Sequence, residues 1–399
     1  MEYPELSKLF HMDTSSDRYS KNEAEATRRK KMESTFIVEM LSDSESFFIA
    51  VPREMIVLIE KILRAERKTS AMMRTIPPIG QAALVRGLVL DEVVSTNTIE
   101  GIHSTRRQIE EALESRETDD TSFKRFKELA LLYLHLAEKD QPSVPETLKE
   151  IREIYDAIME GELKESDKPD GELFRKKGVD ITSNGIKTIH HGIEPESKIF
   201  EGLNNMLKLT ARNDMPELIS SLASHYLFEC IHPFYDGNGR TNRFISSYLL
   251  SKELEPLISY HLAKTIKQNI SKYYKSFDYT NDTDNRGDLT GFITNFLEII
   301  LASIEALIDS LEDKIERLHY FEQILLSNFK DKTDYGILHL LLQNSLFGLE
   351  PLSAREMAEM LDKSYVTINN RLKKDSIKTL LRSDIPHKYD LDLDILKTL

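Results

Sequence analysis

The chain has 399 residues, of which 40% are hydrophobic, and its formal net charge at pH 7 is −14. This length is enough for two or three domains, and the hydrophobic content supports a real core. The negative charge argues against broad nonspecific binding to nucleic acid or to an anionic membrane surface.

No apolar stretch reaches the length of about 18 residues that a transmembrane helix needs, so we expect neither such a helix nor a membrane partner. The N-terminus lacks the basic and apolar pattern of a signal peptide. The single cysteine, Cys230, cannot form an internal disulfide and is expected to be a small core residue. Together these features predict a cytoplasmic protein, with secretion that leaves no cleavable signal as the alternative.

The first part of the chain divides into a polar segment and a series of helices. Residues 1 to about 45 are rich in charge, and we expect the basic run Arg28-Arg-Lys-Lys31 to be solvated or part of an arm rather than a nucleic-acid site. Helical periodicity then predicts helices over residues 52–67, 81–100, 105–114, 122–138 and 144–160.

Glu100 stands at the end of the second of these helices, where Gly101 is a natural stop. A carboxylate in the last turn is unfavourable because a helix C-terminus prefers cations, and local rules are broken most often at functional sites. A buried glutamate here would need a partner, for which an arginine is best suited. The alternative is an ordinary solvated glutamate at a frayed end. Thr105 with Gln108 is expected to form a capping box for the next helix.

Residues 178–189 alternate in polarity around Asn184-Gly185 and predict a β-hairpin. An isolated hairpin in a helical chain is either a surface decoration or a functional element. His190 and His191 follow it and are expected to be surface residues, because no metal-ligand partners with clear spacing accompany them.

The run His232-Pro-Phe-Tyr-Asp-Gly-Asn-Gly-Arg-Thr-Asn-Arg243 follows a helix predicted over residues 218–231. Pro233 discourages continuation of that helix, and the segment 236–239 has turn chemistry. Helical periodicity returns over residues 240–250, with Asn238 as the expected N-cap. A helix start preceded by glycines is an anion site, because its first N–H groups are unpaired and its dipole favours negative charge.

The side chains of this run suit phosphate chemistry. Arg240 and Arg243 lie three apart on one helix face, so both can point toward a phosphate, which guanidinium groups bind bidentately. Asp236 can hold Mg²⁺, and His232 can take a proton near neutral pH. Each part alone is usually structural, but the combination predicts a site that grips a polyphosphate and transfers part of it.

Beyond the run, residues 281–288 resemble a calcium-binding loop only superficially, because Ile293 stands where such a loop needs a bidentate glutamate. We expect a turn there that caps a helix beginning near Leu289. A long amphipathic stretch from Gly291 to about Asn328 then leads to a C-terminal unit.

The C-terminal unit shows helix-turn-helix spacing. Ser353 and Glu356 form the capping box of a helix over residues 352–361, and a second helix covers residues 365–374. The pattern resembles winged helix-turn-helix domains, with the tail through Leu391 as the wing. Between residues 363 and 388 seven basic residues face two acidic ones, a balance of +5. This favours either phosphate contacts with DNA or a packing or protein-interaction module with a solvated basic face. The basic residues are Lys363, Arg371, Lys373, Lys374, Lys378, Arg382 and Lys388.

The run from His232 to Arg243 matches every fixed position of the motif His-x-Phe-x-(Asp/Glu)-Gly-Asn-(Gly/Lys)-Arg-x-x-Arg, and the chain resembles the Fic family over roughly residues 80–300. The resemblance implies transfer of a nucleotide monophosphate, usually AMP from ATP, to a target hydroxyl. It makes His232 the base, places Mg²⁺ on Asp236 and puts the γ-phosphate on Arg243. The remaining phosphate-binding positions it implies are Gly237, Asn238, Gly239 and Arg240. Related kinase-like toxins usually carry lysine in place of Gly239, so the chain resembles the nucleotidyl-transferring branch.

The resemblance extends to two further segments. Thr96-x-x-x-Glu100-Gly101 is similar to the inhibitory motif (Ser/Thr)-x-x-x-Glu-(Gly/Asn), which implies that Glu100 pairs with Arg243 and spoils the ATP pose. In some relatives the same glutamate supports removal of AMP. The predicted hairpin corresponds to the family's target-docking flap, which aligns a protein substrate by strand addition. Its residues are Ile181, Thr182, Ser183, Asn184, Gly185, Ile186 and Lys187.

We therefore expect a mainly α protein with a Fic-type helical core, a small hairpin flap and a C-terminal winged helix-turn-helix-like domain. The expected parts are residues 1–110, 111–300, 301–330 and 331–399. The leading hypothesis is an autoinhibited protein adenylyltransferase that uses Mg²⁺ and ATP, with a homodimer as one candidate assembly. The alternatives are a DNA-binding regulator whose core senses nucleotide or modifies itself, a de-AMPylase, and transfer of another nucleotide or phosphocholine.

Overall fold

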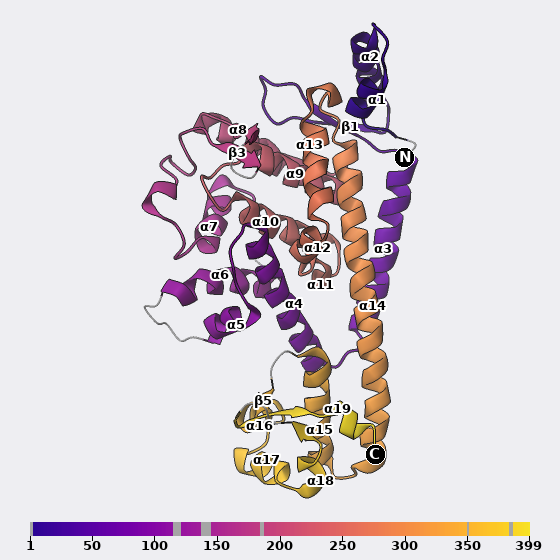
Figure 1. Ribbon diagram of the computed structural model, residues 1–399, viewed down its shortest axis with the longest axis vertical. Coiled ribbons are helices and arrows are strands. Elements are labelled where there is room, and N and C mark those ends of the chain that lie inside the picture. The colour runs from indigo at the N-terminus through magenta and orange to yellow at the C-terminus, as the bar shows by residue number, and fades with distance from the viewer. Residues whose placement is uncertain (1–2, 115–120, 137–144, 184–186, 349–350, 383–385) are drawn as a thin grey trace. The chain divides into compact units, whose positions relative to one another are not determined.

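The computed structural model describes residues 3–114, 121–136, 145–183, 187–348, 351–382 and 386–399 (Figure 1). The chain forms two compact units, one of Met1–Glu66 with Val89–Ile304 and the other of Arg67–Leu88 with Glu305–Leu399. Both consist mainly of helices with a few short strands, which confirms the predicted fold class.

Three helices have residues in both units, namely α3 (Arg53–Met73), α4 (Pro78–Ile99) and α14 (Thr290–Asn328). The other elements of the first unit are α1 (Leu6–Met12), α2 (Arg18–Lys30), β1 (Thr35–Val38), β2 (Phe47–Ala50), α5 (Arg106–Glu114), α6 (Thr121–His135), α7 (Leu148–Ile158), the 3₁₀-helix η1 (Glu165–Asp167), β3 (Asp180–Ser183), β4 (Lys187–His191), α8 (Glu196–Thr210), α9 (Glu217–Ile231), α10 (Asn238–Glu253), α11 (Pro256–Ser259), α12 (Leu262–Gln268), α13 (Ile270–Asn281) and the 3₁₀-helix η2 (Thr283–Asn285). The helices predicted from periodicity are thus present, with shifted ends.

Helices α9 and α10 form the centre of the first unit, and each is buried on nearly every face. His225 of α9 fixes them by contacting Ser246 of α10 at 2.7 Å and Tyr273 of α13 at 2.8 Å. Burial lowers the pKa of His225 to about 3, so this bridge is neutral. The predicted functional loop therefore joins two immobilised helices.

The predicted hairpin is present as strands β3 and β4. They pair antiparallel, with Asp180 opposite His191 and Ser183 opposite Lys187, and the register shifts between Ile181 and Thr182. The turn residues 184–186 lie outside the described part of the chain.

The second unit contains the helix pair predicted near the C-terminus. Ser353 and Glu356 form the predicted capping box, and β7 lies between β5 and β6 in a three-stranded sheet. The elements are α15 (Lys332–Phe347), β5 (Leu352–Ser353), α16 (Ala354–Met360), α17 (Tyr365–Leu372), α18 (Asp375–Lys378), β6 (Leu381–Arg382), β7 (Lys388–Leu391) and α19 (Leu393–Leu396).

Helix α14 is long and apolar enough to cross a membrane by length and composition alone, contrary to the expectation from the sequence. Of its most apolar window, 61% is buried inside the protein, as in the core helix of a soluble protein. This is weak evidence for a membrane span.

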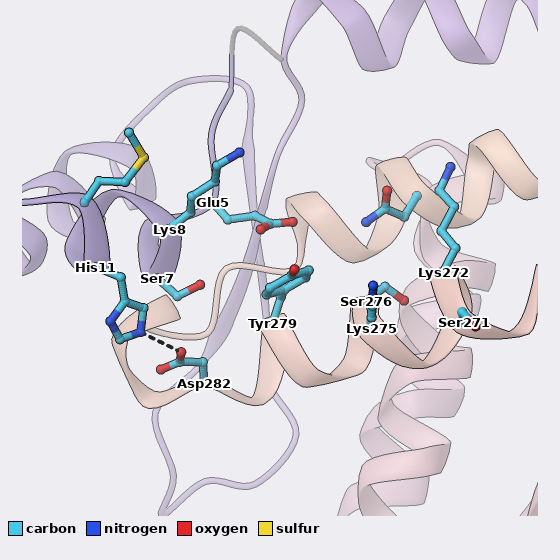
Figure 2. A pocket seen from close by; sticks show the side chains of 12 residues that line it. Glu5, Ser7, Lys8, His11, Ser271, Lys272, Lys275, Ser276, Tyr279 and Asp282 are labelled. Atoms are coloured by element: carbon cyan, nitrogen blue, oxygen red, sulfur yellow. Dashed lines mark hydrogen bonds and ion pairs between the residues drawn. The ribbon is translucent and has the colours of Figure 1, made fainter.

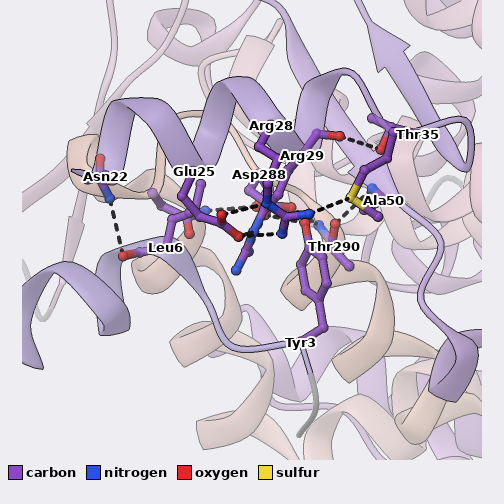
Figure 3. A network of polar contacts seen from close by, with 12 residues as sticks. Tyr3, Leu6, Asn22, Glu25, Arg28, Arg29, Thr35, Ala50, Asp288 and Thr290 are labelled. Atoms are coloured by element: carbon purple, nitrogen blue, oxygen red, sulfur yellow. Dashed lines mark hydrogen bonds and ion pairs between the residues drawn. The ribbon is translucent and has the colours of Figure 1, made fainter. Parts of the chain in front are cut away.

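The N-terminal segment is not an arm, and its basic run is only partly solvated: Arg28 and Lys31 are exposed, whereas Arg29 is buried. The segment folds into α1, α2 and a β1–β2 hairpin, and Arg29 inserts into the first unit (Figure 3). Its guanidinium pairs with Asp288 at 3.0 Å, with exposed side-chain fractions of 3% and 2%, and the Tyr3 hydroxyl donates to the same carboxylate. Asp288 also accepts the Thr290 N–H, so it caps α14 as the sequence predicted for this turn. The composition of a basic run does not show which of its residues forms a specific buried ion pair.

Replacing Arg29 with Met should destabilise the protein by about 3–5 kcal/mol, because Asp288 would keep a buried charge without its cation. Urea unfolding measures this difference. Arg28→Met is the matched control: Arg28 is 63% exposed and its pair with Glu25 is expected to contribute at most about 1 kcal/mol. Equal losses in the two variants would contradict a buried role for Arg29.

Candidate functional site

The loop between α9 and α10 holds His232 in an unusual backbone conformation. His232 ends α9 with φ 50° and ψ 63°, the left-handed region that non-glycine residues rarely adopt. Its N–H donates to Phe228 O at 2.8 Å, and its side chain is 16% exposed. Such strain persists only where surrounding contacts enforce it.

Arg175, which the sequence analysis missed, supplies those contacts. It is fully buried, and its Nε donates to the carbonyl of His232 at 2.8 Å. Its other nitrogens donate to the carbonyls of Ile193, Ile231 and Lys177. One guanidinium therefore fixes the backbone on both sides of the candidate base. Nothing in the local sequence around Arg175 announces this, because its partners are backbone atoms far away in the chain.

Asn238 does not serve as the N-cap of α10, contrary to expectation. Its amide turns back into the loop, accepting from Phe234 N at 2.9 Å and donating to Phe234 O at 2.8 Å. Gly237 takes the cap position with φ 79°, and no side chain caps the helix. The first N–H groups of α10 have no intrahelical partners, so this helix start is suited to an anion.

Arg243 meets the end of α4. Its guanidinium contacts Glu100 Oε1 at 2.5 Å and donates to Thr96 Oγ1 at 2.8 Å. The Arg243 side chain is 3% exposed and that of Glu100 is 31% exposed. Although burial alone would raise the pKa of the Glu100 carboxyl, the attraction of Arg243 outweighs it and holds that pKa below its ordinary value.

The Glu100 carboxylate also lies against the first turn of α10. A Cβ atom added at Gly239 would clash with Glu100 Oε1. The absence of a side chain at Gly239 therefore lets a negatively charged group approach the start of α10. This is the place where the sequence analysis expects phosphate.

Arg240 and Arg243 do not converge in this structure, although they share one helix. Arg240 is 1% exposed and pairs with Glu162 Oε2 at 2.6 Å, on the side of α7. Its guanidinium also contacts the Met159 sulfur at 3.0 Å. Each predicted phosphate-binding arginine thus has a carboxylate partner. Glu162 was missed because it follows α7, far from the run in sequence.

Glu229 lies one helical turn before His232 and faces it. Its Oε2 is 3.7 Å from His232 Nδ1, and its Oε1 accepts from Asn242 at 2.9 Å. Burial raises the pKa of the Glu229 carboxyl to about 7. The spacing of three residues before His232 was the signal that could have drawn attention to it.

Asp236 is exposed at the tip of the loop. One of its carboxylate oxygens accepts from the N–H of Gly237 at 2.7 Å. An exposed carboxylate is the ligand type that Mg²⁺ takes in company with phosphate oxygens, so the residue is chemically suited to that ion.

The β3–β4 hairpin directly follows the segment that contains Arg175. Gly192 N, just after β4, donates to Val179 O at 2.9 Å, and Arg175 contacts the carbonyls of Lys177 and Ile193 on either side of the hairpin. Strands β3 and β4 are therefore tied to the residue that holds His232. Of the predicted flap residues, 181–183 and 187 lie in these strands, and Asn184, Gly185 and Ile186 fall outside the described residues.

The model of the Fic/DOC family matches residues 145–250, which include α7, the hairpin and the entire run from His232 to Arg243. These residues form a Fic/DOC domain. Proteins of this family are in general transferases that move a nucleotide or another group onto a target. Glu100 and Thr96 come from outside the matched residues.

A solved structure with this domain shares its fold, and a second one aligns less well. A Fic family protein from Desulfovibrio desulfuricans G20 aligns with a TM-score of 0.51 at 17% identity, covering 83% of this chain and 95% of that one. Fic-1 from C. elegans aligns with a TM-score of 0.47 at 17% identity, covering 66% of this chain and 75% of that one.

The raised pKa of Glu229 predicts a pH-dependent stability. Between its ordinary value of 4.5 and about 7, the folded protein keeps a proton that the unfolded chain releases. The stabilising contribution is therefore complete below pH 4.5 and is lost as the pH rises through about 7. The shift corresponds to at most about 3 kcal/mol.

Urea unfolding of wild type and Glu229→Gln across this pH range measures the effect. The stability advantage of wild type over the variant should fall as the pH rises. Glu196→Gln is the control, because hydrogen bonds from the backbone of residues 172–174 outweigh burial and hold the pKa of Glu196 below its ordinary value. It should not change the slope above pH 5. Parallel curves for wild type and Glu229→Gln would contradict the assignment.

Proposed function

We propose that this protein is an adenylyltransferase that transfers AMP from ATP to a hydroxyl side chain of a target protein or of itself. The observation that carries the proposal is the placement of a carboxylate, Glu100, on Arg243 beside the uncapped start of α10. A helix start together with a guanidinium is an anion site. In this structure the Glu100 carboxylate occupies the Arg243 part of that anion site.

In this proposal, the phosphates of ATP bind along the start of α10. The N–H groups of Gly239 and its neighbours donate to phosphate oxygens, and Arg243 receives the γ-phosphate once Glu100 has left it. Mg²⁺ would be held by Asp236 and would neutralise phosphate charge. The left-handed backbone at His232 and the Arg175 contacts hold the loop in place before the substrate arrives. Such preorganisation favours a reaction that depends on positioning.

The chemical step is then a displacement at the α-phosphorus. His232 accepts the proton of the target hydroxyl, and the hydroxyl oxygen forms a bond to the α-phosphorus. The bond between that phosphorus and the oxygen bridging to the β-phosphate breaks, and pyrophosphate leaves. Glu229 is suited to orient the imidazole through its Nδ1 side, so that Nε2 can serve as the base. The target segment would add as a strand to the β3–β4 hairpin.

The choice of AMP over another nucleotide, over phosphocholine and over the reverse reaction rests on the resemblance of the loop and on Gly239. Intact mass of the chain after incubation with ATP, GTP, UTP or CTP tests it. An added mass other than that of AMP, or removal of AMP from a modified chain, would contradict the proposal and favour one of the alternatives.

Glu100→Gly should raise self-modification with ATP and Mg²⁺ about tenfold or more, the factor that corresponds to about 1.4 kcal/mol. The substitution removes the carboxylate that competes with phosphate for Arg243. Incorporation of label from α-labelled ATP measures the rate. Glu111→Gly, at an exposed helical carboxylate paired with Arg107, is the matched control and should leave the rate unchanged.

The double variant Glu100→Gly with His232→Ala should carry no label, because the base is gone while the brake stays released. Label at the wild-type level in Glu100→Gly would contradict the inhibitory role of Glu100. Label that survives in the double variant would remove His232 as the base.

For the C-terminal unit, we propose a winged-helix-like module that packs or binds protein rather than DNA. Arg371 and Lys374, two of its seven basic residues, each pair with Asp334 at 2.8 Å, and Arg371 also pairs with Asp331. At the start of α17 the apolar Tyr365 and Val366 are 52% and 64% exposed. The positive charge of the C-terminal unit is therefore partly neutralised by its own carboxylates, Asp331 and Asp334.

In a gel-shift experiment near physiological salt, the full chain should not retard duplex DNA fragments. The paired arginine and lysine are unavailable for phosphate, and the chain as a whole is acidic. A salt-sensitive shift that is weakened by replacing the exposed Lys373 and Lys378 with Gln would contradict this and favour the DNA-binding alternative.

A further inference from the structure

A cavity of about 970 Å³ lies in the first unit, away from the candidate active site, between the N-terminal segment and α13 (Figure 2). The N-terminal side of its wall includes Glu5, Ser7 and His11, and the other side includes Ser276, Tyr279 and Asp282.

Three metal-ligand side chains gather beside this cavity, and two of them, His11 and Asp282, line it. They are His11 at the end of α1, and Asp282 and Asp284 at the η2 turn. Their ligand atoms all lie within 4.8 Å of one another, and His11 Nε2 is 3.3 Å from Asp282 Oδ2. Figure 2 shows the imidazole pointing directly at this carboxylate. Two segments 271 residues apart thus supply one cluster.

Hydrogen bonds that involve the backbone hold both segments in place. Asp282 Oδ1 accepts from Asp284 N at 2.9 Å, which turns the other oxygen of Asp282 toward His11. Asn22 of α2 donates to the carbonyls of Leu6 and Asp284 and thereby ties α1 to the η2 turn. The backbone therefore brings the three side chains together without their own interaction being needed.

The charge of the cluster calls for a cation. Asp282 and Asp284 bring two carboxylates together beside one imidazole. Among the described residues, His11 is the basic side chain that pairs with Asp282, and no lysine or arginine forms an ion pair with Asp284. A solvated His–Asp pair would account for one carboxylate but not for the second one beside it.

The ligand set selects the kind of ion. Ca²⁺ and Mg²⁺ take oxygen ligands, whereas imidazole suits Zn²⁺ and neighbouring transition metals. Residues 281–288 resemble a calcium loop that lacks its bidentate glutamate, and the fold supplies a histidine instead. Three protein ligands would leave open positions facing the cavity.

A buried hydroxyl lines the same cavity. Ser7 stands one turn before His11 on α1, is 2% exposed, and its Oγ has no hydrogen-bond partner among the described residues. In Figure 2 its oxygen points into the space between α1 and α13. Buried hydroxyls are normally satisfied, so this one indicates a polar ligand or metal-bound water in the cavity.

We propose that His11, Asp282 and Asp284 bind one divalent transition-metal ion of the Zn²⁺ class. The ion fastens α1 to the turn between α13 and α14, and its open positions face the cavity beside Ser7.

Calorimetric titration of the full, chelator-treated chain with Zn²⁺ tests the proposal, with Co²⁺ absorption as a second probe. Wild type should bind one equivalent at this site. His11→Ala and the isosteric Asp284→Asn should each weaken binding about tenfold or more. His232→Ala is titrated alongside, so that zinc bound at the candidate active site is recognised and subtracted.

His191→Ala is the matched control, because His191 contacts Asp180 at 2.5 Å in an exposed His–Asp pair that is not part of a three-ligand cluster. It should bind zinc like wild type. Hydrogen exchange of α1 should slow on adding Zn²⁺ to wild type and not to Asp284→Asn. Zinc binding that is absent, or unchanged by both His11→Ala and Asp284→Asn, would overturn the site.

AMP transfer under ATP and Mg²⁺ should be the same in His11→Ala and wild type. The metal site and the proposed enzymatic function can therefore fail independently of one another.

Discussion

The buried guanidinium of Arg243 is the constraint on which the candidate site depends. A charged group that is 3% exposed needs a partner. In this structure α4 provides it through Glu100 and Thr96. The pairing brings a helix from outside the Fic/DOC domain onto the start of α10. The same contact therefore neutralises the Arg243 charge in this structure and puts a carboxylate where the proposed function needs a phosphate.

Arg240 is held in the same way, by a carboxylate that follows α7. Its guanidinium is as deeply buried as that of Arg243, and Glu162 neutralises it. An incoming triphosphate would thus exchange one anion for another rather than meet bare cations. Such an exchange keeps each guanidinium paired in a poorly solvated place, which costs less than leaving one unpaired.

The sequence predicted those parts of the molecule that local patterns encode. Periodicity located α4, α7, α9 and α10, and capping chemistry located the starts of α5 and α16. What it missed depends on contacts distant in the chain. Arg175 binds backbone carbonyls up to 57 residues away, and Arg29 pairs with Asp288 across 259 residues. Neither residue type nor spacing marks such partners. The hydrogen bonds of the Asn238 amide within its own loop were missed. An asparagine side chain can either cap a helix or hold a loop, and the sequence pattern is the same in both cases.

The physics of the Glu100–Arg243 pair limits how the proposed autoinhibition can be relieved. Because Arg243 holds the pKa of Glu100 below its ordinary value, protonation near neutral pH does not break the contact. Moving α4 as a whole is also costly, since Glu92 on that helix is buried and accepts from Ala263 N at the start of α12. The Glu100 side chain, at 31% exposed, is the freer element. A ligand shifts such an equilibrium only by its differential affinity for the two states. Release therefore depends on an anion that binds Arg243 more strongly than a single carboxylate does, or on a partner that draws the Glu100 side chain away.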